Sequence, residues 1–466
     1  MRLWLVILLS ISSLSTIGCS ASHHNAPVYS NGTQLVDQSG RAVVLRGVNI
    51  RAANFFDPYH AQLPLPPFTA DDCRVVGQDL GMNALRLPIN WSLLEPTRGN
   101  IDGAYVQMVI QLAADCYQQG VYTFVDLHQD AWSKYIGADG APFWAHAPAL
   151  PAVDADERDG NQASTSAAVQ AAFNGLISDA TLMQDYANMA AELARLIENK
   201  PGVVGLELMN EPLSTQAQLA TFYGIVAPAV RAAAPGLPIY FEPDALRNVI
   251  DFANPDPLTV HDTVYSPHLY TGVFQGNWMV GQDARIEQSV SGIVDEGQEA
   301  DAAVMVTEFG NDPADPVGAA WLTAAYTSLD AHALSASLWL YEEWPSTCGN
   351  PSCWGLYDEM PTTDSTGQVA FARTLRSEAV TLVARAYPRA IAGTLQSFTY
   401  DPTTLTLTVQ MQGTAGTHIL AAPTAVYKSD IAVTCDGKAV KTTRVGSEVT
   451  TSCAGKTLVM TSANAG

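Results

Sequence analysis

Basic residues are scarce in this chain of 466 residues. It has 23 lysines and arginines against 46 aspartates and glutamates, which leaves a formal net charge of −23. Nucleic acids and anionic membranes are bound through clustered cations, so this balance argues against either as the main partner. Hydrophobic residues make up 47% of the chain, which is ample for a large core and argues against global disorder.

A long apolar run is also lacking. The N-terminal stretch Leu3–Leu14 is too short to span a bilayer comfortably and follows a basic residue, a pattern typical of an export signal. We expect residues 1–22 to be a signal peptide. Alternatively, Gly18-Cys19 resembles the end of a bacterial lipobox, so that the signal is residues 1–18 and Cys19 is lipidated. The expected location is therefore outside the cell, either secreted or lipid-anchored to the bacterial envelope through Cys19.

Sequence patterns for metals and nucleotides are absent. No CxxC pair or His/Cys cluster has zinc-ligand spacing, and no GxGxxG follows the first expected strand, so we expect no metal and no cofactor. Setting Cys19 aside leaves an even number of cysteines, as expected for an exported chain. The sequence leaves their connectivity open, although they fall into three regional pairs: Cys73 with Cys116, Cys348 with Cys353, and Cys435 with Cys453.

Apolar strand segments alternate with amphipathic helical segments through most of the chain. This order predicts an α/β fold, a (β/α)8 TIM barrel over residues 28–388, with a last helix over Gln368–Tyr387. An open doubly wound sheet is the alternative, which the missing GxGxxG disfavours. The expected strands are Val44–Ile50, Ala84–Asn90, Tyr122–His128, Val203–Asn210, Ile239–Pro243, Thr263–Tyr270, Ala303–Gly310 and Ala336–Glu343.

Two regions depart from this alternation. Residues 390–466 alternate with period two and are rich in Thr and Val, which predicts a small C-terminal antiparallel β-sandwich domain. Its few aromatic residues favour a structural appendage over a carbohydrate-binding module. The connection Gln129–Ala180 is far longer than most loops, and its aromatic first part is typical of a binding loop, whereas no role is assigned to its Ala-rich part, 147–180.

Two glutamates each close an apolar strand. Glu211 ends the run VVGLELMNEP, and Glu308 ends the run AVMVTEFG. Glutamate is rarely buried without a partner, and burial raises the pKa of a carboxyl group, which is what a general acid needs near neutrality. Because catalytic groups of TIM barrels lie at the C-terminal ends of the strands, these side chains should share one mouth. A carboxylate pair there suggests hydrolysis of glycosidic bonds.

Other expected strand ends are also polar or aromatic. Each such residue has an ordinary structural explanation when taken alone: a buried arginine pairs with a carboxylate, a histidine is often a satisfied core residue, and a tryptophan usually packs in the core. However, six of the eight expected strands deliver such side chains to one face, whereas chance packing would scatter them. The candidates are Arg86, His128, Asp130, Asn210, His268, Tyr270 and Trp339.

Taken together, the segments LRLPINW, DLHQD, LMNEP, SPHLY, TEFG and SLWLY resemble glycoside hydrolase family 5, a group of retaining (β/α)8 enzymes, over about residues 30–390. Within that family, HQDAWSKY followed by GAPFWA resembles the endoglycoceramidases, which release the whole glycan from ceramide in glycosphingolipids. The junction YPRAIAGT before the small β domain resembles them as well.

The resemblance assigns roles to the candidate residues. It implies that Glu211 is the acid/base, that Glu308 is the nucleophile of a double displacement, and that Asn210 holds the sugar 2-hydroxyl. Arg86 would lie near Glu308 and keep it ionised for attack. The subsite of the cleaved sugar would be lined by His128, Asp130, His268, Tyr270 and Trp339.

One segment departs from the endoglycoceramidase pattern. After the first strand, NIRAANFFDP offers Arg51 and Asn54 where those enzymes tend to place a lysine that contacts the sugar, so the preference for glucose or galactose next to ceramide stays open. An apolar path for a lipid tail is expected from Phe55-Phe56 and from the loop aromatics Trp132, Tyr135, Phe143 and Trp144.

We therefore expect a monomeric retaining endo-β-glycosidase that acts on glycolipid, with transient contact with a lipid or micelle surface. Three alternatives remain: a cellulase-like family 5 β-glycanase, an exo-acting glucosyl- or galactosyl-lipid β-glycosidase, and a non-catalytic glycan-binding surface lipoprotein. A polysaccharide cleft should carry tryptophan platforms on both sides of the glutamates, whereas a ceramide site should have one polar and one apolar side. The intact set of candidate residues argues against the non-catalytic alternative.

Overall fold

The computed structural model describes residues 27–51, 68–133, 136, 140–146, 167–343, 354–363, 365–367 and 369–462. The signal segment with Cys19, the pair Cys348 and Cys353, Asn54, Phe55-Phe56 and Tyr135 lie outside the described residues.

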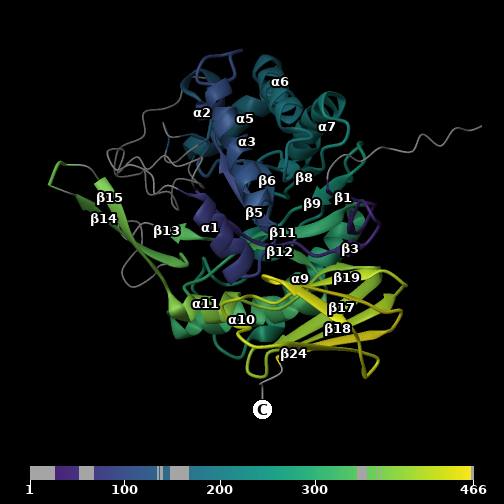
Figure 1. The fold of residues 1–466 in the computed structure, drawn as a ribbon. Helices are drawn as coiled ribbons and strands as arrows, with labels where there is room; N and C mark the ends of the chain where they lie inside the picture. Colours follow the sequence, from purple (N-terminus) through teal and green to yellow (C-terminus); the bar gives the residue numbers. More distant parts are fainter. Residues whose placement is uncertain are drawn as a thin grey trace, which may run out of the picture.

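Eight parallel strand positions close into a barrel, which confirms the predicted fold class (Figure 1). The sixth position consists of two strands, β9 and β10, which both pair with β11. Pro267 lies between them and has no N–H to donate to the ladder, which accounts for the break. The strands are β4 (Arg46–Asn49), β5 (Ala84–Ile89), β6 (Tyr122–Leu127), β7 (Val203–Glu207), β8 (Ile239–Phe241), β9 (Thr263–Tyr265), β10 (His268–Leu269), β11 (Ala303–Phe309) and β12 (Ser335–Leu338).

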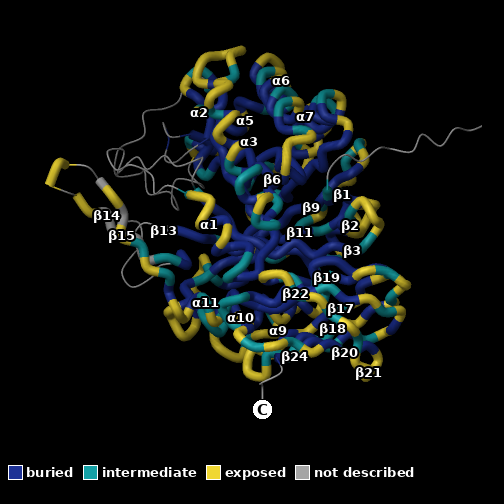
Figure 2. The backbone as a smooth tube through the Cα atoms, viewed as in Figure 1, coloured by how far each residue is buried: buried dark blue, intermediate teal, exposed yellow. Residues whose placement is uncertain are grey.

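Helices cover the outside of the barrel and bury an apolar face against the strands, so that buried backbone is concentrated in the strands (Figure 2). Three helices begin at aspartates whose side chains accept from the first free backbone N–H groups: Asp102, Asp179 and Asp315. The helices are α1 (Ala70–Arg74), continued by the π-helical turn η1 (Val75–Asp79), α2 (Trp91–Leu94), α3 (Gly103–Tyr117), α5 (Ala167–Ser178), α6 (Ala180–Ile197), α7 (Gln216–Ala233), α8 (Arg247–Ile250), α9 (Asp283–Glu299) and α10 (Pro316–Ala331), with a 3-10 turn η2 (Phe143–Ala145).

The expected last helix, Gln368–Tyr387, is wrong over its first half. Strand β15 (Val369–Leu375) pairs antiparallel with β14 (Tyr357–Thr363), and only α11 (Ser377–Val383) is helical. The short strand β13 (Glu342–Glu343) pairs with β14, and the β14–β15 hairpin projects away from the barrel (Figure 1). The periodicity of a single segment does not reveal the strand that will pair with it, which explains the error.

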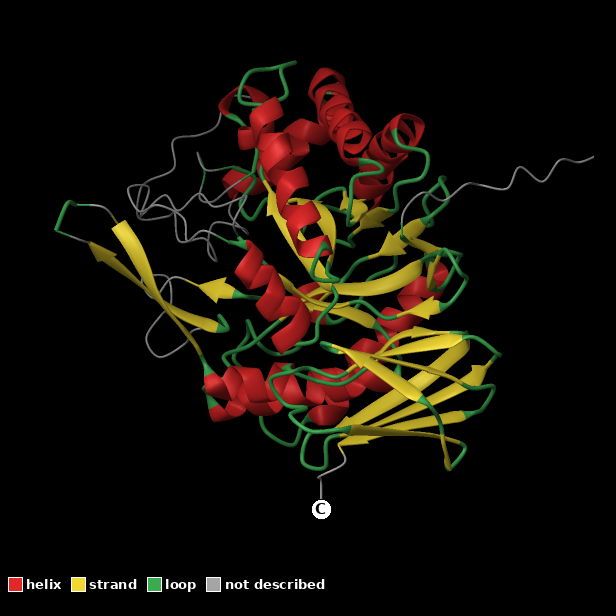
Figure 3. Cartoon of the chain, viewed as in Figure 1, coloured by secondary structure: helices red, strands yellow, loops and turns green. Residues whose placement is uncertain are grey.

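Two antiparallel sheets pack beside the barrel as a sandwich around a common apolar core (Figure 3). One sheet combines both chain ends, so residues 28–43 share a sheet with residues 388–452. In order it contains β1 (Val28–Ser30), β2 (Leu35–Asp37), β3 (Ala42–Val43), β16 (Pro388–Ile391), β19 (Thr417–Ala421), β23 (Glu448–Ser452) and β22 (Thr442–Val445). The other contains β17 (Gly393–Asp401), β18 (Thr406–Gly413), β24 (Thr457–Ser462), β20 (Ile431–Cys435) and β21 (Lys438–Ala439).

Buried polar contacts fix the sandwich to the barrel. The Arg389 guanidinium donates to the carbonyls of Gly81 and Met82 at 3.0 and 2.9 Å, and the Ser447 hydroxyl donates to the carbonyl of Gly77 at 2.6 Å. These acceptors lie at the end of η1 and in the turn before β5, on the side of the barrel opposite the strand C-termini. These contacts therefore attach the sandwich to the side of the barrel opposite its C-terminal mouth.

Two disulfides occur in the described residues. Cys73 is bonded to Cys116, which ties α1 to α3, and Cys435 is bonded to Cys453 within the sandwich. Both agree with the regional pairs expected from the sequence. Within the described parts of the chain, no helix combines the length and the apolar character that crossing a membrane requires.

Candidate active site

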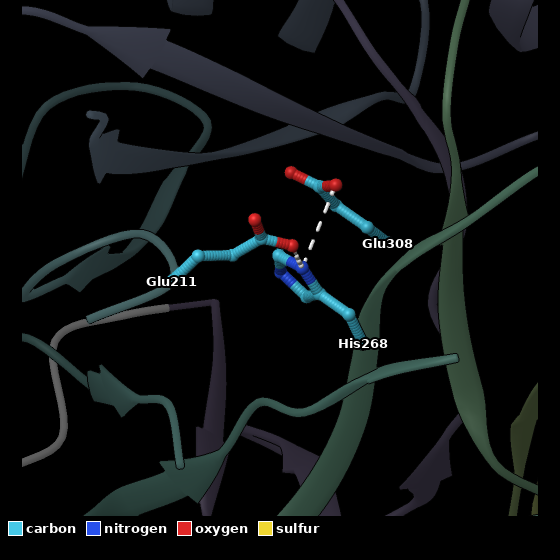
Figure 4. A group of neighbouring side chains, drawn as sticks. All are labelled: Glu211, His268 and Glu308. Atoms are coloured by element: carbon cyan, nitrogen blue, oxygen red, sulfur yellow. Dashed lines mark hydrogen bonds and ion pairs between the residues drawn. The ribbon is translucent and has the colours of Figure 1, made fainter. Parts of the chain in front are cut away.

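Two glutamates meet at the C-terminal mouth of the barrel. Glu211 follows β7, Glu308 lies near the end of β11, and His268 of β10 lies between them (Figure 4). One carboxylate oxygen of each glutamate and one ring nitrogen of His268 lie within 4.8 Å of one another. Retaining glycosidases hold their two carboxyl groups about 5–5.5 Å apart, whereas inverting ones leave room for a water. The spacing of this pair therefore fits double displacement.

Both carboxylate oxygens of Glu308 are held by donors. Nη1 of Arg86 donates to Oε1, and the hydroxyl of Tyr270 donates to Oε2 at 2.8 Å. Burial, together with the nearby charges of Glu308 and Glu211, raises the pKa of Tyr270 well above its ordinary value. Its hydroxyl therefore stays protonated and remains a donor. A guanidinium and a neutral hydroxyl stabilise negative charge on Glu308, as a carboxylate nucleophile requires.

The surroundings of Glu211 differ from those of Glu308. Its Oε1 accepts from Nδ2 of Asn248 at 2.6 Å and lies 2.7 Å from Nδ1 of His268. Among the described residues, no donor contacts Oε2, and the side chain is 25% exposed. Because both donors lie on Oε1, Oε2 is the oxygen that can carry a proton toward a substrate.

The backbone of Glu211 adopts an unusual conformation with a φ of 40°. A non-glycine residue in this left-handed region costs about 1–2 kcal/mol. The conformation is held from both sides: the Gln129 amide donates to the carbonyls of Asn210 and Glu211 at 2.6 and 3.0 Å, and the Glu211 N–H donates to Glu242 at 3.0 Å. Neighbouring strand ends thus aim the Glu211 side chain into the mouth.

Arg86 of β5 is the centre of the charge cluster below the two glutamates. Besides Glu308, its guanidinium contacts Glu207 at 2.6 Å, Asp126 at 3.0 Å and Glu242 at 3.2 Å. Burial by itself would lower the pKa of Arg86, but the four carboxylates outweigh it and the pKa is raised. The four carboxylates therefore keep the fully buried Arg86 protonated, and they share its positive charge.

Asn210 is fixed by the same network. Its Oδ1 accepts from Nη2 of Arg86 at 2.7 Å, and its Nδ2 donates to the Gln129 carbonyl at 2.9 Å. An amide nitrogen has two N–H groups, so one donor remains for a ligand.

The remaining candidates form a stack beside the pair. The rings of His128 and Trp339 lie 5.8 Å apart and nearly parallel. The guanidinium of Arg51, from the segment after the first barrel strand, lies 5.2 Å from the Trp339 ring. Nδ1 of His128 contacts Asp126 at 2.7 Å, and Nε2 lies 3.4 Å from Asp130. Burial would lower the pKa of His128, but Asp130 and Asp126 raise it well above its ordinary value. Asp126 contacts both His128 and Arg86, so among the described residues it connects His128 to the central cluster.

Sequence reasoning missed four residues of this site. Glu207 and Glu242 are buried carboxyl groups on Arg86, the Asn49 side chain accepts from Arg86 at 3.1 Å, and Asn248 contacts Glu211. A signal existed for the two glutamates: each interrupts an apolar strand segment, Glu207 in VVGLELMNEP and Glu242 in IYFEP. For Asn248, which lies on a four-residue helix, the sequence carries no comparable signal.

Two of the aromatic residues expected to line an apolar path, Trp132 and Trp144, pack against other rings, whereas Phe143 is 71% exposed. Trp132 is fully buried and packs edge-on against Trp91 and Phe173, and Trp144 packs against Trp91. Segment 129–180 also contains α5, so its last part is helical. The two tryptophans pack against Trp91 after β5 and, through Trp132, against Phe173 of α5.

Glu211, His268 and Glu308 are also the described residues that come closest to a metal-ligand set. Their ligand atoms are already engaged, however: Arg86 and Tyr270 hold the oxygens of Glu308, and His268 and Asn248 hold Oε1 of Glu211. A permanent cation beside Glu308 would repel a metal ion. The donor set therefore suits carbohydrate chemistry better than metal binding.

A closed (β/α)8 barrel with a close glutamate pair at its C-terminal mouth defines a retaining glycoside hydrolase of the barrel type. The family description "Cellulase (glycosyl hydrolase family 5)" matches residues 36–343, and "Glycoside hydrolase family 5 C-terminal domain" matches residues 385–466. The chain therefore belongs to glycoside hydrolase family 5, as the sequence segments predicted.

Two curated relatives are both named as endoglycoceramidases. Endoglycoceramidase I of Rhodococcus hoagii (strain 103S) is 29% identical over 323 residues, which is 61% of this chain and 62% of the relative. Endoglycoceramidase of Cyanea nozakii is 26% identical over 279 residues, which is 51% of this chain and 55% of the relative. The matched region thus spans about three-fifths or less of the length of these proteins.

Solved structures match nearly the whole chain. Endo-glycoceramidase II from Rhodococcus sp. has a TM-score of 0.76 at 23% identity and covers 92% of this chain and 100% of its own. A crystal structure of endogalactoceramidase has a TM-score of 0.75 at 26% identity and covers 94% of this chain and 100% of its own. The barrel and the sandwich beside it are therefore shared as one unit.

Proposed function

We propose that this protein is a retaining endo-β-glycosidase that hydrolyses the bond between the glycan and ceramide in glycosphingolipids. The observation that carries the proposal is the pair Glu211 and Glu308. One oxygen of each lies within 4.8 Å of the other, and the two carboxyl groups differ in their contacts and in their exposure. One carboxyl group is held by a cation, and the other is partly exposed with one free oxygen.

The chemistry follows from these surroundings. An oxygen of Glu308 attacks the anomeric carbon while the glycosidic C–O bond breaks, and Glu211 gives its proton to the leaving ceramide oxygen. The glycan is then an ester of Glu308. In the second step Glu211 takes a proton from water, the water oxygen attacks the anomeric carbon, and the ester bond to Glu308 breaks. Asn210 is assigned to the sugar 2-hydroxyl, to which its free N–H can donate.

The distribution of apolar surface favours a lipid as the leaving group. Arg51, Trp339 and His128, which stack on one another, follow strands β4, β12 and β6 on one side of the barrel mouth. The segments that follow β8 and β10 carry exposed apolar side chains, and the first of these segments includes Asn248, which contacts the proposed acid. The exposed apolar residues are Leu246, Val249, Ile250, Phe252, Phe274, Met279 and Val280. One polar and one apolar side is the pattern expected for a glycolipid and not for a polysaccharide.

The relatives support the same substrate class. The Rhodococcus structures include a complex with "Ganglioside GM3" and a "Lactosyl-Enzyme Intermediate". A covalent intermediate and a glycolipid ligand in those proteins agree with a retaining mechanism on glycolipid for this chain.

The test is incubation of the purified protein with a ganglioside, glucosylceramide, galactosylceramide and a soluble β-glucan, with the Glu308→Gln variant as control. Release of intact glycan together with ceramide supports the proposal, and the comparison of the two monohexosylceramides settles the sugar preference. NMR of the first product should show the β anomer, as retention requires. Activity on the β-glucan alone would overturn the proposal in favour of a family 5 β-glycanase.

We further propose export of the protein, with Cys19 as a lipidation site or with cleavage near residue 22. Mass spectrometry of the mature N-terminus in a bacterial host distinguishes the two: a diacylated Cys19 supports the lipoprotein, and a free N-terminus near residue 22 supports secretion.

A further inference from the structure

Glu242 is a buried carboxyl group that contacts three residues of the site. It follows β8 and is 3% exposed. Its Oε2 accepts from the backbone N–H of Glu211 at 3.0 Å, and its Oε1 lies 3.2 Å from Nη2 of Arg86 and 3.3 Å from Nε2 of His268. Its own backbone is held by the Tyr223 hydroxyl, which accepts from the Glu242 N–H at 3.1 Å and donates to the Glu242 carbonyl at 2.8 Å. Its position is therefore rigid.

His268 connects Glu242 to the proposed acid. Its Nδ1 lies 2.7 Å from Oε1 of Glu211, while Nε2 faces Glu242 on the other side of the ring. This arrangement of a carboxyl group, an imidazole and a second carboxyl group resembles a catalytic triad, in which an outer carboxyl group sets the tautomer of the histidine. When the shared proton rests on Glu242, it is donated to Nε2, and the neutral ring carries its own proton on Nδ1, which donates to Glu211. When the shared proton moves to Nε2, the ring becomes an imidazolium and Nδ1 still donates.

We propose that Glu242 is a positioning residue for Glu211: it holds the Glu211 backbone in its left-handed conformation and fixes His268 with Nδ1 as the donor to Oε1. This inference rests on the proposed function, since it assigns Glu211 the role of acid. It concerns leaving-group protonation and not attack by Glu308.

The proton balance of the first step agrees with this assignment. When Glu211 gives its proton from Oε2 to the leaving oxygen, it becomes a carboxylate, and the Nδ1–H of His268 already points at its Oε1. The proton shared by Glu242 and His268 can then rest on Nε2, which leaves an imidazolium between two carboxylates. No proton is lost to solvent, and the second step reverses the transfer when Glu211 accepts a proton from water.

The charges around Glu242 support a shared proton. Burial raises the pKa of Glu242 to about 8, helped by Glu207 and opposed by His268 and Arg86. Burial would lower the pKa of His268, but Glu242 and Glu308 raise it well above its ordinary value. The groups that face Glu242 are Arg86 from β5, Glu207 and Glu211 from β7 and its extension, Tyr223 from α7 and His268 from β10.

The first experiment compares two leaving groups. Wild type, Glu242→Leu and Glu242→Gln are assayed on a dinitrophenyl β-glycoside, which needs no acid, and on the phenyl β-glycoside of the same sugar, which does. A positioned general acid contributes about 100-fold or more, so Glu242→Leu should lower kcat/KM on the phenyl substrate by about 100-fold and spare the dinitrophenyl substrate. Glu242→Gln should recover most of the loss, because its amide accepts from the Glu211 N–H and donates to Nε2 of His268.

Glu207→Leu is the matched control. Glu207 is an equally buried carboxyl group on Arg86, at 2.6 Å, and among the described residues its hydrogen bonds go to Arg86 and Thr307 and not to Glu211. It should lower activity on both substrates equally, through Arg86 and Glu308. The proposal would be overturned if Glu242→Leu lost kcat/KM equally on both substrates or lost none. It would also be overturned if Glu242→Gln were as impaired as Glu242→Leu. A wild-type protein that releases no glycan from any of the glycolipids and cleaves no aryl glycoside would instead overturn the proposed function, and this inference with it.

A second measurement does not depend on activity or on the Leu variant. In ¹⁵N-histidine-labelled wild type, with His268→Gln to assign the signals, His268 should carry its proton on Nδ1 near neutral pH. A neutral ring protonated only on Nε2 would overturn the proposal even if every variant were stable.

Discussion

Removal of the Arg86 cation is the most informative perturbation of this site. In Arg86→Met, an unbranched apolar side chain replaces the aliphatic stem of the arginine, so the packing of the stem is kept while the guanidinium and its charge are lost. Four carboxyl groups contact this fully buried cation, through Asp126, Glu207, Glu242 and Glu308. Loss of one partner of a buried ion pair costs about 3–5 kcal/mol, because it leaves uncompensated charge. Since a domain is stable by only about 5–15 kcal/mol, the effect should be large.

The loss should depend on pH with a definite sign. Burial raises the pKa of Glu207 and of Glu242 even with Arg86 present, and its removal must raise both further. A carboxyl group with a raised pKa binds its proton more tightly in the folded state than in the unfolded state. The stability of the folded state is then greatest below the unfolded pKa, about 4.3, and falls as the pH rises toward the folded pKa. The deficit of Arg86→Met should be small at pH 5 and reach about 3–5 kcal/mol near pH 8.

The assay is urea unfolding of wild type and variant at pH 5 and pH 8, followed by tryptophan fluorescence. Arg195→Met is the control, since Arg195 pairs with Glu192 on the surface and its loss should not change stability measurably. A deficit that is equal at both pH values, or below about 1 kcal/mol at pH 8, would refute the view that Arg86 neutralises the buried carboxyl groups.

Three further outcomes are expected. Glu308→Gln should abolish turnover on all substrates. Glu211→Gln should lower kcat/KM by about 100-fold to 10,000-fold on a phenyl β-glycoside and keep activity on the dinitrophenyl β-glycoside. Equal losses of Glu211→Gln on the two substrates would contradict its role as acid. Replacing Cys73 and Cys116 by Ala should lower the free energy of unfolding by about 2–4 kcal/mol in urea titrations, and an unchanged midpoint would show that the bridge is dispensable. Since burial raises the pKa of Glu242 to about 8, the stability of Glu242→Gln relative to wild type should rise between pH 5 and pH 9; a constant difference would contradict this.

Much of the site was predictable because strand ends in a barrel converge. Glu211 and Glu308 each follow an apolar run, and the parallel order of the strands brings both to one mouth. Arg86, His268 and Tyr270 follow the same rule, and the structure brings all of them into contact with one of the two glutamates. Trp339 lies further out, where it stacks on His128.

Other parts of the structure depend on which segments pair with each other as strands. The β14–β15 hairpin replaces half of an expected helix because β14 supplies a partner strand. In the same way, β3 pairs with β16, so the sandwich uses both ends of the chain. Strand pairing is decided by contacts between two segments, which are neighbours in sequence for β14 and β15 but hundreds of residues apart for β3 and β16, and the period of one segment carries no information about its partner.

The order of elements and the identity of the two glutamates follow from the sequence alone, because burial and periodicity are local properties of each strand. The different surroundings of those glutamates are a property of the tertiary structure only. Arg86 and Tyr270 hold one carboxyl group, while Asn248 and His268 hold one oxygen of the other, and Glu242 contacts its backbone. These partners come from β5, from the ends of β8 and β10, and from helix α8, and only closure of the barrel sets the distances that separate a nucleophile from an acid.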